Sequence, residues 1–344
     1  MRTVRCPGRV NLIGDHTDYN GGIAMPMAID LYTEAVFRPD GSKTTITITS
    51  EAEPDPATFP ADLDPDPDRI RAMEPAWART AAAIVALLRT SSGGSLAITG
   101  NLPLGAGLSS SAAFEVATAL ALGLEGDPVT IATFCRHAGE LATGVPAGLM
   151  DQLTVTSATA GHALLIDFSD LTTQPVPIPE NVEVVVVHSG ESRSLAKSAY
   201  AARRAECEAA SFHVGELGQV APSDVQGLPD PLLRRRARHV TTECERVRAF
   251  AEALAGGRPE EAGKLMLESH RSLAEDFEVS TPGLDSLVER LSGLPRVYGA
   301  RLTGAGFGGC VVALCEPGTV DVARYPSGAW VVSPSAAATV TGTD

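Results

Sequence analysis

The segment from Pro7 to Gly22, PGRVNLIGDHTDYNGG, gathers side chains that can do chemistry. Its ionisable members are Arg9, Asp15, His16 and Asp18. Glycines explain a tight turn, but a turn needs neither a guanidinium nor two carboxylates beside an imidazole. A guanidinium can stabilise a transferring negative charge, and carboxylates with an imidazole can bind several hydroxyl groups of a polyol. The segment therefore predicts half of a site whose other half lies elsewhere in the chain.

A second glycine-rich segment, LPLGAGLSSSAAFEVA at Leu102–Ala117, has the predicted order strand, turn, helix. A helix N-terminus carries unpaired N–H groups and the positive end of the helix dipole, and glycines let the backbone close around an anion. Ser109, Ser110 and Ser111 add hydroxyls that can bind phosphate or Mg²⁺. The pattern GxxxxGK[ST] is absent, which excludes a P-loop NTPase. A serine-capped buried helix is the alternative, but a cap needs only one serine.

A third glycine-rich segment, LTGAGFGGCVVAL at Leu302–Leu314, contains the pattern GxGxxG in Gly304, Gly306 and Gly309. A dinucleotide-binding fold requires a helix after this pattern. Here the following residues, Cys310–Cys315, predict a strand, so we reject that interpretation. Two alternatives stay open: a structural turn where backbones approach closely, or a turn that packs against a cofactor or against the second segment.

Asp151 in GVPAGLMDQL and Glu140 in RHAGELATG are further candidates for acid–base or metal chemistry. In isolation, Asp151 is better explained as a helix N-cap and Glu140 as a surface residue. Phosphoryl transfer from a nucleotide to an alcohol gives them roles, because it needs a metal, a positive charge and a carboxylate near the acceptor hydroxyl. Ser111 and Glu140 could hold Mg²⁺, and Asp151 could accept the hydroxyl proton. Arg9 could stabilise the transferring charge and keep Asp151 ionised.

The elements that must position these residues mix strands and helices without a strict βαβ alternation. Period-two or buried apolar runs predict strands at residues 44–50, 95–104, 182–188 and 311–315. Helices are predicted at residues 112–124, which are rich in alanine, and at residues 192–210. The mixture predicts an α+β fold with helices on one face of largely antiparallel sheets.

Three segments are predicted to be irregular. Proline and aspartate in Glu53–Asp68 predict an exposed loop. The tail Ser333–Asp344 is predicted to be frayed. The proline-rich stretch Pro175–Pro179 is the predicted crossing between two domains.

Composition limits the class of protein. A chain of 344 residues favours two domains, and 44% hydrophobic residues are enough for a core. The formal net charge of −15 argues against a nucleic acid or a membrane surface as partner. Six cysteines without a CxxC pair predict reduced thiols, and no apolar run has the length of a membrane span. The start has no apolar core of signal-peptide length. We therefore expect a cytoplasmic protein.

The glycine-rich segments resemble the motifs of a known family. PGRVNLIGDHTDYNGG is similar to the galactokinase signature, and LPLGAGLSSSA and LTGAGFGGC resemble the second and third motifs of the GHMP kinases (galacto-, homoserine, mevalonate and phosphomevalonate kinases). GLMDQL resembles the segment that carries the catalytic aspartate of that family. The resemblance implies an α+β, two-domain GHMP kinase fold. Its active site would lie in the cleft between domains at residues 1–174 and 175–344.

The resemblance also implies roles for individual residues. Asp151 would be the general base and Arg9 the charge stabiliser, while Ser111 and Glu140 would bind Mg²⁺. The phosphates of ATP would lie on Gly105, Ala106, Gly107, Leu108, Ser109, Ser110 and Ser111. The sugar would contact Asp15, His16, Asp18, Gly148 and Tyr200.

Two aromatic residues carry weaker assignments. Trp77 resembles a residue near the adenine, although a core tryptophan explains it nearly as well. Tyr200 resembles the tyrosine of a family helix, and its alternative is also a core aromatic.

The resemblance implies ATP-dependent phosphorylation of the anomeric hydroxyl of D-galactose by a monomer. One departure bears on the substrate: family galactokinases usually have Glu where this chain has Asp15, which is one methylene shorter. Kinases for L-arabinose, galacturonate or another galacto-configured sugar are alternatives, although a substrate carboxylate would be repelled by Asp15. A non-catalytic regulator on the same fold is a further alternative. It would be expected to lose a catalytic group, whereas Arg9, Ser111, Glu140 and Asp151 are all present.

Overall fold

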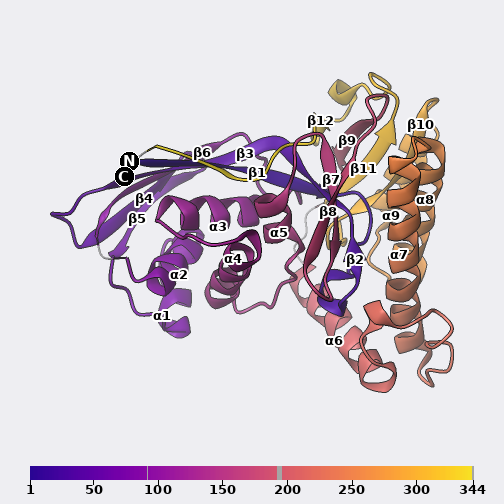
Figure 1. The fold of residues 1–344 in the computed structure, drawn as a ribbon, viewed down its shortest axis with the longest axis horizontal. Helices are drawn as coiled ribbons and strands as arrows, with labels where there is room; N and C mark the ends of the chain where they lie inside the picture. The colour runs from indigo at the N-terminus through magenta and orange to yellow at the C-terminus, as the bar shows by residue number, and fades with distance from the viewer. Residues whose placement is uncertain (91, 192–195, 343–344) are drawn as a thin grey trace.

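The structure is a computed structural model that describes residues 1–90, 92–191 and 196–342. In these residues one side of the molecule is a six-stranded sheet with the order β13–β1–β3–β6–β4–β5 (Figure 1). Its strand pairs are antiparallel except for β4 with β6, which run parallel. The strands are β1 (Arg2–Asn11), β3 (Pro26–Pro39), β4 (Thr45–Ser50), β5 (Glu53–Pro60), β6 (Gly94–Gly100) and β13 (Thr339–Thr341).

Helices α1 to α5 cover one face of this sheet (Figure 1). They are α1 (Pro67–Arg71), α2 (Arg79–Leu88), α3 (Ser110–Ala121), α4 (Pro128–Thr143) and α5 (Met150–Ser157). The alanines of α3 let it pack directly on β1 and β3, and α2 and α4 pack against α3. Helix α4 begins where the Asp127 carboxylate accepts from the Thr130 N–H and Pro128 occupies the first turn.

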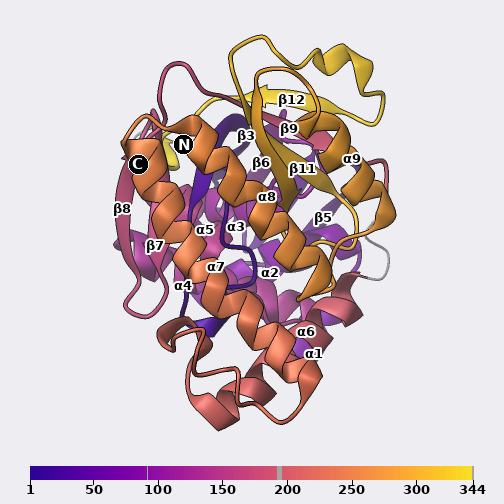
Figure 2. The same cartoon turned by 90° about the vertical axis from the view of Figure 1, so that its right-hand side faces the viewer.

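The other side of the molecule holds a four-stranded sheet with the order β10–β11–β9–β12 (Figure 2). Helices α8 and α9 lie against it, and α7 packs on α8 and on β2 and β8. A small sheet, β2–β7–β8, lies between the two sides (Figure 1). The strands are β2 (Ile23–Ala24), β7 (His162–Asp167), β8 (Thr172–Pro177), β9 (Glu183–His188), β10 (Val297–Thr303), β11 (Cys310–Cys315) and β12 (Ala329–Val332). The helices are α6 (Ala196–Val214), α7 (Pro231–Ala255), α8 (Pro259–Glu275) and α9 (Pro282–Ser292).

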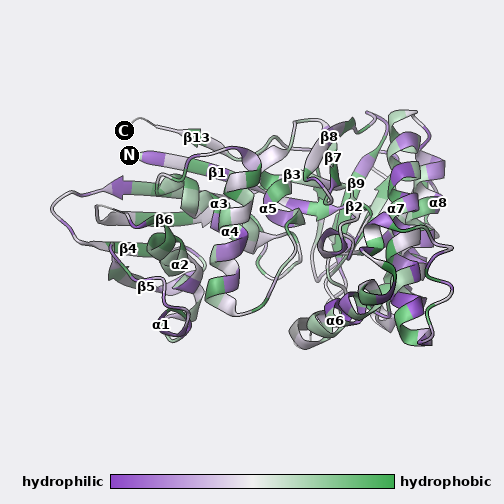
Figure 3. Cartoon of the chain, turned by 60° about the horizontal axis from the view of Figure 1, so that its bottom comes forward, coloured by the Kyte–Doolittle hydropathy of each residue, from purple (hydrophilic) through white to green (hydrophobic). Residues whose placement is uncertain are grey.

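Strand β9 divides the two main hydrophobic cores. Val184 and Val186 point into the core under the large sheet, whereas Val185 and Val187 point into the core formed with α7 to α9. Successive side chains of a strand point to opposite faces, so the run VEVVVVH fits a strand buried on both sides. Hydrophobic and hydrophilic residues alternate along α7 and α8, as expected of helices with one buried face (Figure 3).

Most predicted elements are confirmed with shifted ends. The α+β fold with helices on one face of a largely antiparallel sheet is confirmed, as are strands β4, β6, β9 and β11 and helix α3. Helix α6 covers residues 196–210 of the helix predicted at residues 192–210, while residues 192–195 lie outside the described part of the chain. The division into domains at residues 174 and 175 stays a prediction.

The prediction of an exposed loop at Glu53–Asp68 is wrong over its first half. Glu53–Pro60 forms β5, which pairs with β4 and buries Ala57 and Phe59. Proline cannot donate to a strand ladder, but β5 is the edge of the sheet, where one side of the strand has no neighbour. The prolines therefore mark an edge strand and not a loop.

The prediction of a frayed C-terminal tail is also wrong for the residues that the structure describes. Thr339–Thr341 pairs with β1, and the Ser335 N–H donates to the Ala28 carbonyl at 2.9 Å. The C-terminal strand thus returns to the first sheet beside the N-terminus (Figure 1). Residues up to Pro177 belong to β8, which pairs with β7, and the crossing between two domains at Pro175–Pro179 stays a prediction.

Two composition-based predictions can be compared with the structure. Among the described residues no helix is both long and apolar enough to span a membrane. All six cysteine side chains are buried.

Candidate active site

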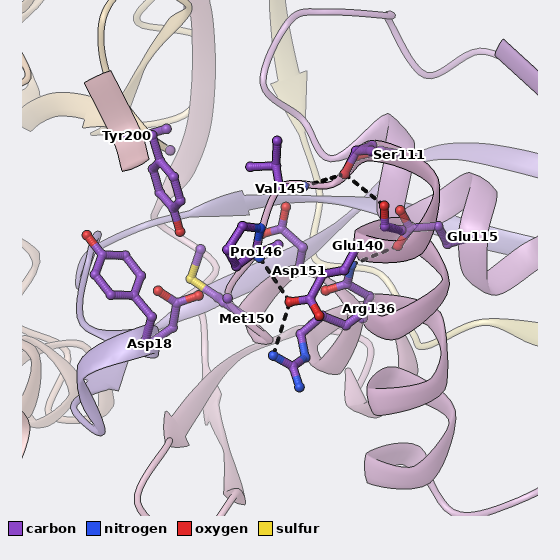
Figure 4. A pocket seen from close by; sticks show the side chains of 18 of the residues that line it. Asp18, Ser111, Glu115, Arg136, Glu140, Val145, Pro146, Met150, Asp151 and Tyr200 are labelled. Carbon is purple, nitrogen blue, oxygen red and sulfur yellow. Dashed lines mark hydrogen bonds and ion pairs between the residues drawn. The ribbon is translucent and has the colours of Figure 1, made fainter. Parts of the chain in front are cut away.

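The main cavity has a volume of about 510 Å³ and is lined by residues from all of the predicted motifs. Figure 4 shows side chains from the N-terminal segment, α3, α4, α5 and α6 pointing into one space. The residues with predicted roles that line it are Arg9, Asp15, His16, Asp18, Ser111, Glu140, Gly148, Asp151 and Tyr200. Gly304 of the third motif also lines it. Residues as far apart as 9 and 304 in the sequence therefore share one cavity.

The N-terminal segment turns sharply after β1. Gly14 has a φ of +95°, and a Cβ there would lie 2.6 Å from the Ala24 Cα, so only glycine fits. His16 also has a positive φ, of +67°. This turn directs the Asp15 side chain into the protein, where it is 2% exposed.

Asp15 is held by residues of β10 and of the third motif. Its Oδ2 lies 2.7 Å from Arg301 Nη2, and its Oδ1 accepts from the Gly304 N–H at 3.0 Å. Burial raises the pKa of the Asp15 carboxyl, and the adjacent Arg301 guanidinium opposes that rise. The structure thus places Asp15 at the cavity wall with both carboxylate oxygens already engaged.

A second buried acid fixes the backbone of the same turn. Glu243 of α7 accepts from the Gly14 N–H at 3.0 Å and from the Ser269 hydroxyl at 2.5 Å. Burial raises the pKa of Glu243, but the surrounding cations, Arg246 first, outweigh it and hold the pKa at about 2. His239 of α7 contacts the Asp15 carbonyl at 3.1 Å. The C-terminal half of the chain therefore holds the turn that presents the polar side chains.

His16 lies in an aromatic environment. Its Nδ1 contacts the Tyr19 hydroxyl at 2.9 Å, and its ring centroid lies 4.6 Å from Phe277 and 5.8 Å from Tyr200. Burial lowers the pKa of His16 to about 3, so the imidazole is neutral near pH 7. A neutral ring offers one donor and one acceptor to a bound molecule.

Asp18 faces Gly148, which lies in the turn before α5. A Cβ on residue 148 would overlap the Asp18 carboxylate, so the close approach requires glycine. Burial, and then the negative charge of Asp151, raise the pKa of Asp18 to about 6. Tyr200 of α6 points into the cavity near Asp18 (Figure 4). The predicted sugar-contacting residues thus surround one part of the cavity.

Arg9 and Asp151 form a tight ion pair despite a separation of 142 residues. Arg9 Nε and Nη2 donate to Asp151 Oδ1 at 2.7 and 2.6 Å, and Arg9 Nη1 donates to the Gly107 carbonyl at 2.8 Å. The Ser109 hydroxyl donates to the other carboxylate oxygen of Asp151 at 2.5 Å. Ser109 therefore orients Asp151, and its own contact to a phosphate would have to come from its backbone N–H.

The second glycine-rich segment is a turn followed by a helix, as predicted. Gly105 and Gly107 have φ values of +73° and +79°, and α3 begins at Ser110. The third motif packs against this turn, because Cys310 Sγ donates to the Ala106 carbonyl at 2.8 Å. Both alternatives for the third motif have support, because a Cβ on Gly306 would also overlap the Val279 carbonyl oxygen, and a contact with a cofactor stays a prediction. The turn is followed by strand β11, so the dinucleotide-binding fold is excluded as predicted.

Ser111 and Glu140 line the same part of the cavity (Figure 4). Ser111 is exposed at the start of α3. Glu140 Oε1 accepts from Arg136 Nη1 at 3.3 Å and from the Ala147 N–H at 3.1 Å. The described residues contain no group of three or more His, Cys, Asp or Glu side chains that could hold a metal. Any metal here would have few protein ligands.

Trp77 lines a second cavity of about 280 Å³. Its indole N–H donates to the Asp55 carbonyl of β5 at 3.2 Å. The two cavities share Thr80 and Ser111, so they adjoin at the start of α3. A ligand with phosphates on the α3 turn could therefore extend from one cavity into the other.

Further polar residues without a predicted role line the main cavity, and Arg136, Glu115 and Gln152 are among them. Arg136 precedes Glu140 by one helical turn, a spacing that predicts an ion pair. Glu115 is the one charged residue in AAFEVATALALGL, and that anomaly was a usable signal. Gln152 follows Asp151 directly.

Comparison with known proteins identifies the family. The galactokinase galactose-binding signature matches residues 2–39, the GHMP kinase N-terminal domain residues 77–159, and the GHMP kinase C-terminal domain residues 250–325. A galactokinase of Roseiflexus sp. is 42% identical over 94% of this chain and 85% of its own length. The chain belongs to the galactokinase family. A human galactokinase is 41% identical over 91% of this chain and 83% of its own length.

Solved structures of the family agree with this fold. The Lactococcus lactis galactokinase complexed with galactose has a TM-score of 0.89 and 28% identity, covering 98% of this chain and 94% of that chain. The mevalonate kinase of Methanococcus jannaschii shares the fold, with a TM-score of 0.69 and 19% identity over 97% of this chain and 98% of its own. The predicted GHMP kinase fold is thus confirmed.

Proposed function

We propose that this galactokinase-family chain transfers the γ-phosphoryl group of ATP to the anomeric hydroxyl of D-galactose. The products are galactose 1-phosphate and ADP. The observation that carries the proposal is that Arg9 of the N-terminal segment bonds both to Asp151 of α5 and to the Gly107 carbonyl in the turn before α3. A carboxylate beside the acceptor and a cation beside the phosphate loop are what phosphoryl transfer needs. The name and bound galactose of the Lactococcus relative support the choice of sugar.

Asp151 accepts the proton of the attacking hydroxyl in this proposal. The two bonds from Arg9 and the one from Ser109 fix its orientation, so the proton acceptor is positioned before the substrate arrives. Arg9 also stabilises charge that develops on the transferring group, together with the N–H groups at the start of α3. The hydrogen bonds from Arg9 to Asp151 and to the Gly107 carbonyl, and from Ser109 to Asp151, are 2.5–2.8 Å long.

ATP binds with its phosphates on the turn from Gly105 to Ser111 and its base in the cavity beside Trp77. Mg²⁺ would be held by Ser111 and Glu140. The oxygen donors fit this ion, because Mg²⁺ usually keeps several waters and takes only one or two protein ligands beside the phosphates of its nucleotide. When bound, the ion would neutralise charge on the phosphates.

The sugar binds among Asp15, His16, Asp18, Gly148 and Tyr200. Carboxylates accept from hydroxyl groups, and the neutral His16 ring can donate or accept. A buried negative charge at Asp15 disfavours substrates with a carboxylate, such as galacturonate. All six cysteines are free thiols, which supports a reducing compartment, so we include the cytoplasm in the proposal. The monomeric state stays a prediction.

The test is ADP release measured over a panel of sugars with the purified protein. D-Galactose should give the highest kcat/KM, and L-arabinose and other galacto-configured sugars should give lower values. A higher kcat/KM for another sugar would show that this sugar, and not D-galactose, is the preferred substrate. No ADP release with any sugar would leave the non-catalytic regulator as the better interpretation.

A further inference from the structure

A buried carboxyl lies where three helices of the active site meet. Glu115 of α3 is 6% exposed and lines the main cavity behind Ser111 (Figure 4). Its neighbours along α3 are apolar or small residues. Helix packing against β1 and β3 would be satisfied by a hydrophobic side chain at this position. A buried carboxyl is costly unless it has partners, so its contacts indicate what it does.

The first contact is with α5. Gln152 Nε2 donates to Glu115 Oε2 at 2.8 Å, and Gln152 is itself 6% exposed. Gln152 directly follows Asp151, in the first turn of α5. A hydrogen bond on Gln152 therefore fixes the helix turn that carries the proton acceptor.

The second contact is with α4. Gly139 lies so close that a Cβ there would be 2.7 Å from Glu115 Oε1. The next residue is Glu140, whose carboxylate lines the cavity. The backbone of α4 therefore packs against the Glu115 carboxyl. This contact is directly before Glu140, which is proposed to bind Mg²⁺.

The third link is within α3. Ser111 precedes Glu115 by four residues, so the two side chains lie on the same face of the helix. Each of the three helices thus carries one proposed functional group near Glu115. Ser111 lies one turn before Glu115 on α3, Asp151 adjoins the contact residue Gln152 on α5, and Glu140 adjoins the contact residue on α4. Burial raises the pKa of Glu115 to about 8, so the carboxyl is neutral near pH 7 and adds no charge to the site.

We propose that Glu115 is a positioning residue that sets Asp151, Glu140 and Ser111 at the correct separation for phosphoryl transfer. This inference rests on the proposed function, since it assumes that those three groups act together. It predicts a defect in turnover and in metal requirement, with little change in affinity for the sugar. Four of the five sugar contacts lie on other elements, the N-terminal segment and α6, and only Gly148 lies in the turn before α5.

The test uses Glu115→Leu, which fills the space without the hydrogen bond, and Glu115→Gln, which keeps an acceptor for Gln152. We expect Glu115→Leu to lower kcat by about 10–100-fold, as loss of a group that supports a metal site usually does. The Mg²⁺ concentration for half-maximal rate should rise, and KM for galactose should stay within about threefold, a change of under one kcal/mol by the usual conversion. Glu115→Gln should recover most of the lost kcat.

Two matched variants separate positioning from general stability. Val116→Ala makes a cavity in the adjacent, fully buried position of α3, so it should lower Tm while leaving kcat unchanged. Gln152→Leu breaks the same hydrogen bond from α5, and it keeps the test decisive if Glu115→Leu does not fold. The double variant Glu115→Leu/Gln152→Leu should lose no more kcat than the worse single variant, because the pair acts as one unit.

The inference and the proposed function fail in different ways. If the unmodified protein phosphorylates galactose and folded Glu115→Leu matches its kcat and Mg²⁺ dependence, the positioning role is overturned alone. A proportional loss of kcat in Val116→Ala would also overturn it. If the unmodified protein is inactive with every sugar, the proposed function fails, and calorimetry of Mg²⁺–ATP binding then decides the inference. Weaker binding in Glu115→Leu than in Val116→Ala would support it, and equal binding would overturn it.

Discussion

The two halves of the main cavity are built in different ways. On the sugar side, Asp15 and His16 are 2% and 5% exposed, and buried partners from β10 and α7 hold the turn that carries them. On the phosphate side, Ser111 is exposed and the adjoining Leu104 is 65% exposed. The sugar side is therefore preorganised, which reduces the cost of ordering it on binding. In the proposed function, the phosphate side would rely on backbone N–H groups and on a ligand that brings its own charge and metal.

The difference follows from where the partners come from. Arg301 lies 2.7 Å from Asp15 and 3.9 Å from Glu243, and it is fully buried. A fully buried cation between two buried acids ties the N-terminal segment to the C-terminal half of the chain. The Arg9–Asp151 pair lies between the two halves, with Asp151 30% exposed on the cavity side. The reaction would take place where the rigid half meets the open half.

Removing the buried cation Arg301 should have the largest effect, and it should lower the free energy of unfolding. Arg301→Met leaves the buried Asp15 carboxylate without its cation, while Glu243 keeps Arg246, and we expect a loss of about 3–5 kcal/mol in the free energy of unfolding. Arg258→Met is the control, since its ion pair with Glu261 is more than half exposed and should be worth about 0–1 kcal/mol. Urea unfolding of both variants measures the difference. Equal losses would show that the buried network does not stabilise the sugar side.

Filling the contact between Asp18 and residue 148 should have the next largest effect. Gly148→Ala places a methyl group where the Asp18 carboxylate lies, and such overpacking costs about 1–3 kcal/mol. We expect KM for galactose to rise about 10–100-fold while KM for ATP changes little. Gly227→Ala is the control, because nothing lies within 4 Å of a Cβ there. If ATP and galactose were affected alike, Gly148 would not belong to the sugar side alone.

Titration of Asp18 should have a smaller effect. Its pKa is raised to about 6, so the carboxylate is present above that pH and becomes protonated as pH falls through it. One acceptor for the sugar is then lost, and kcat/KM for galactose should fall by about tenfold from pH 7 to pH 5. The neighbouring His16, with a pKa of about 3, does not titrate in this range. The acid limb should disappear in Asp18→Asn; its persistence there would assign the limb to another group.

The sequence predicted the residues of the site better than it predicted the architecture of the fold. The three glycine-rich segments and GLMDQL carry 13 of the 22 residues that line the cavity, and they were detectable because their residue types are unusual for turns. Edge strand β5 was missed because its prolines suggest a loop until the sheet order is known. Arg301 and Glu243 were missed because their roles come from pairing across more than 200 residues, which no local pattern records. Glu115 was detectable as a lone charge in an apolar helix, but its three-helix junction required the fold.

The central claim is that Asp151 is the proton acceptor between the sugar side and the phosphate side of the cavity. The decisive measurement compares Asp151→Asn with the unmodified protein for phosphorylation of galactose and for ATP binding. Asn keeps the shape of the side chain and loses the basic oxygen, so we expect kcat to fall by about 10²–10⁴-fold, the usual contribution of a general base. ATP affinity should be unchanged. Near-normal turnover in a folded Asp151→Asn variant would contradict the account.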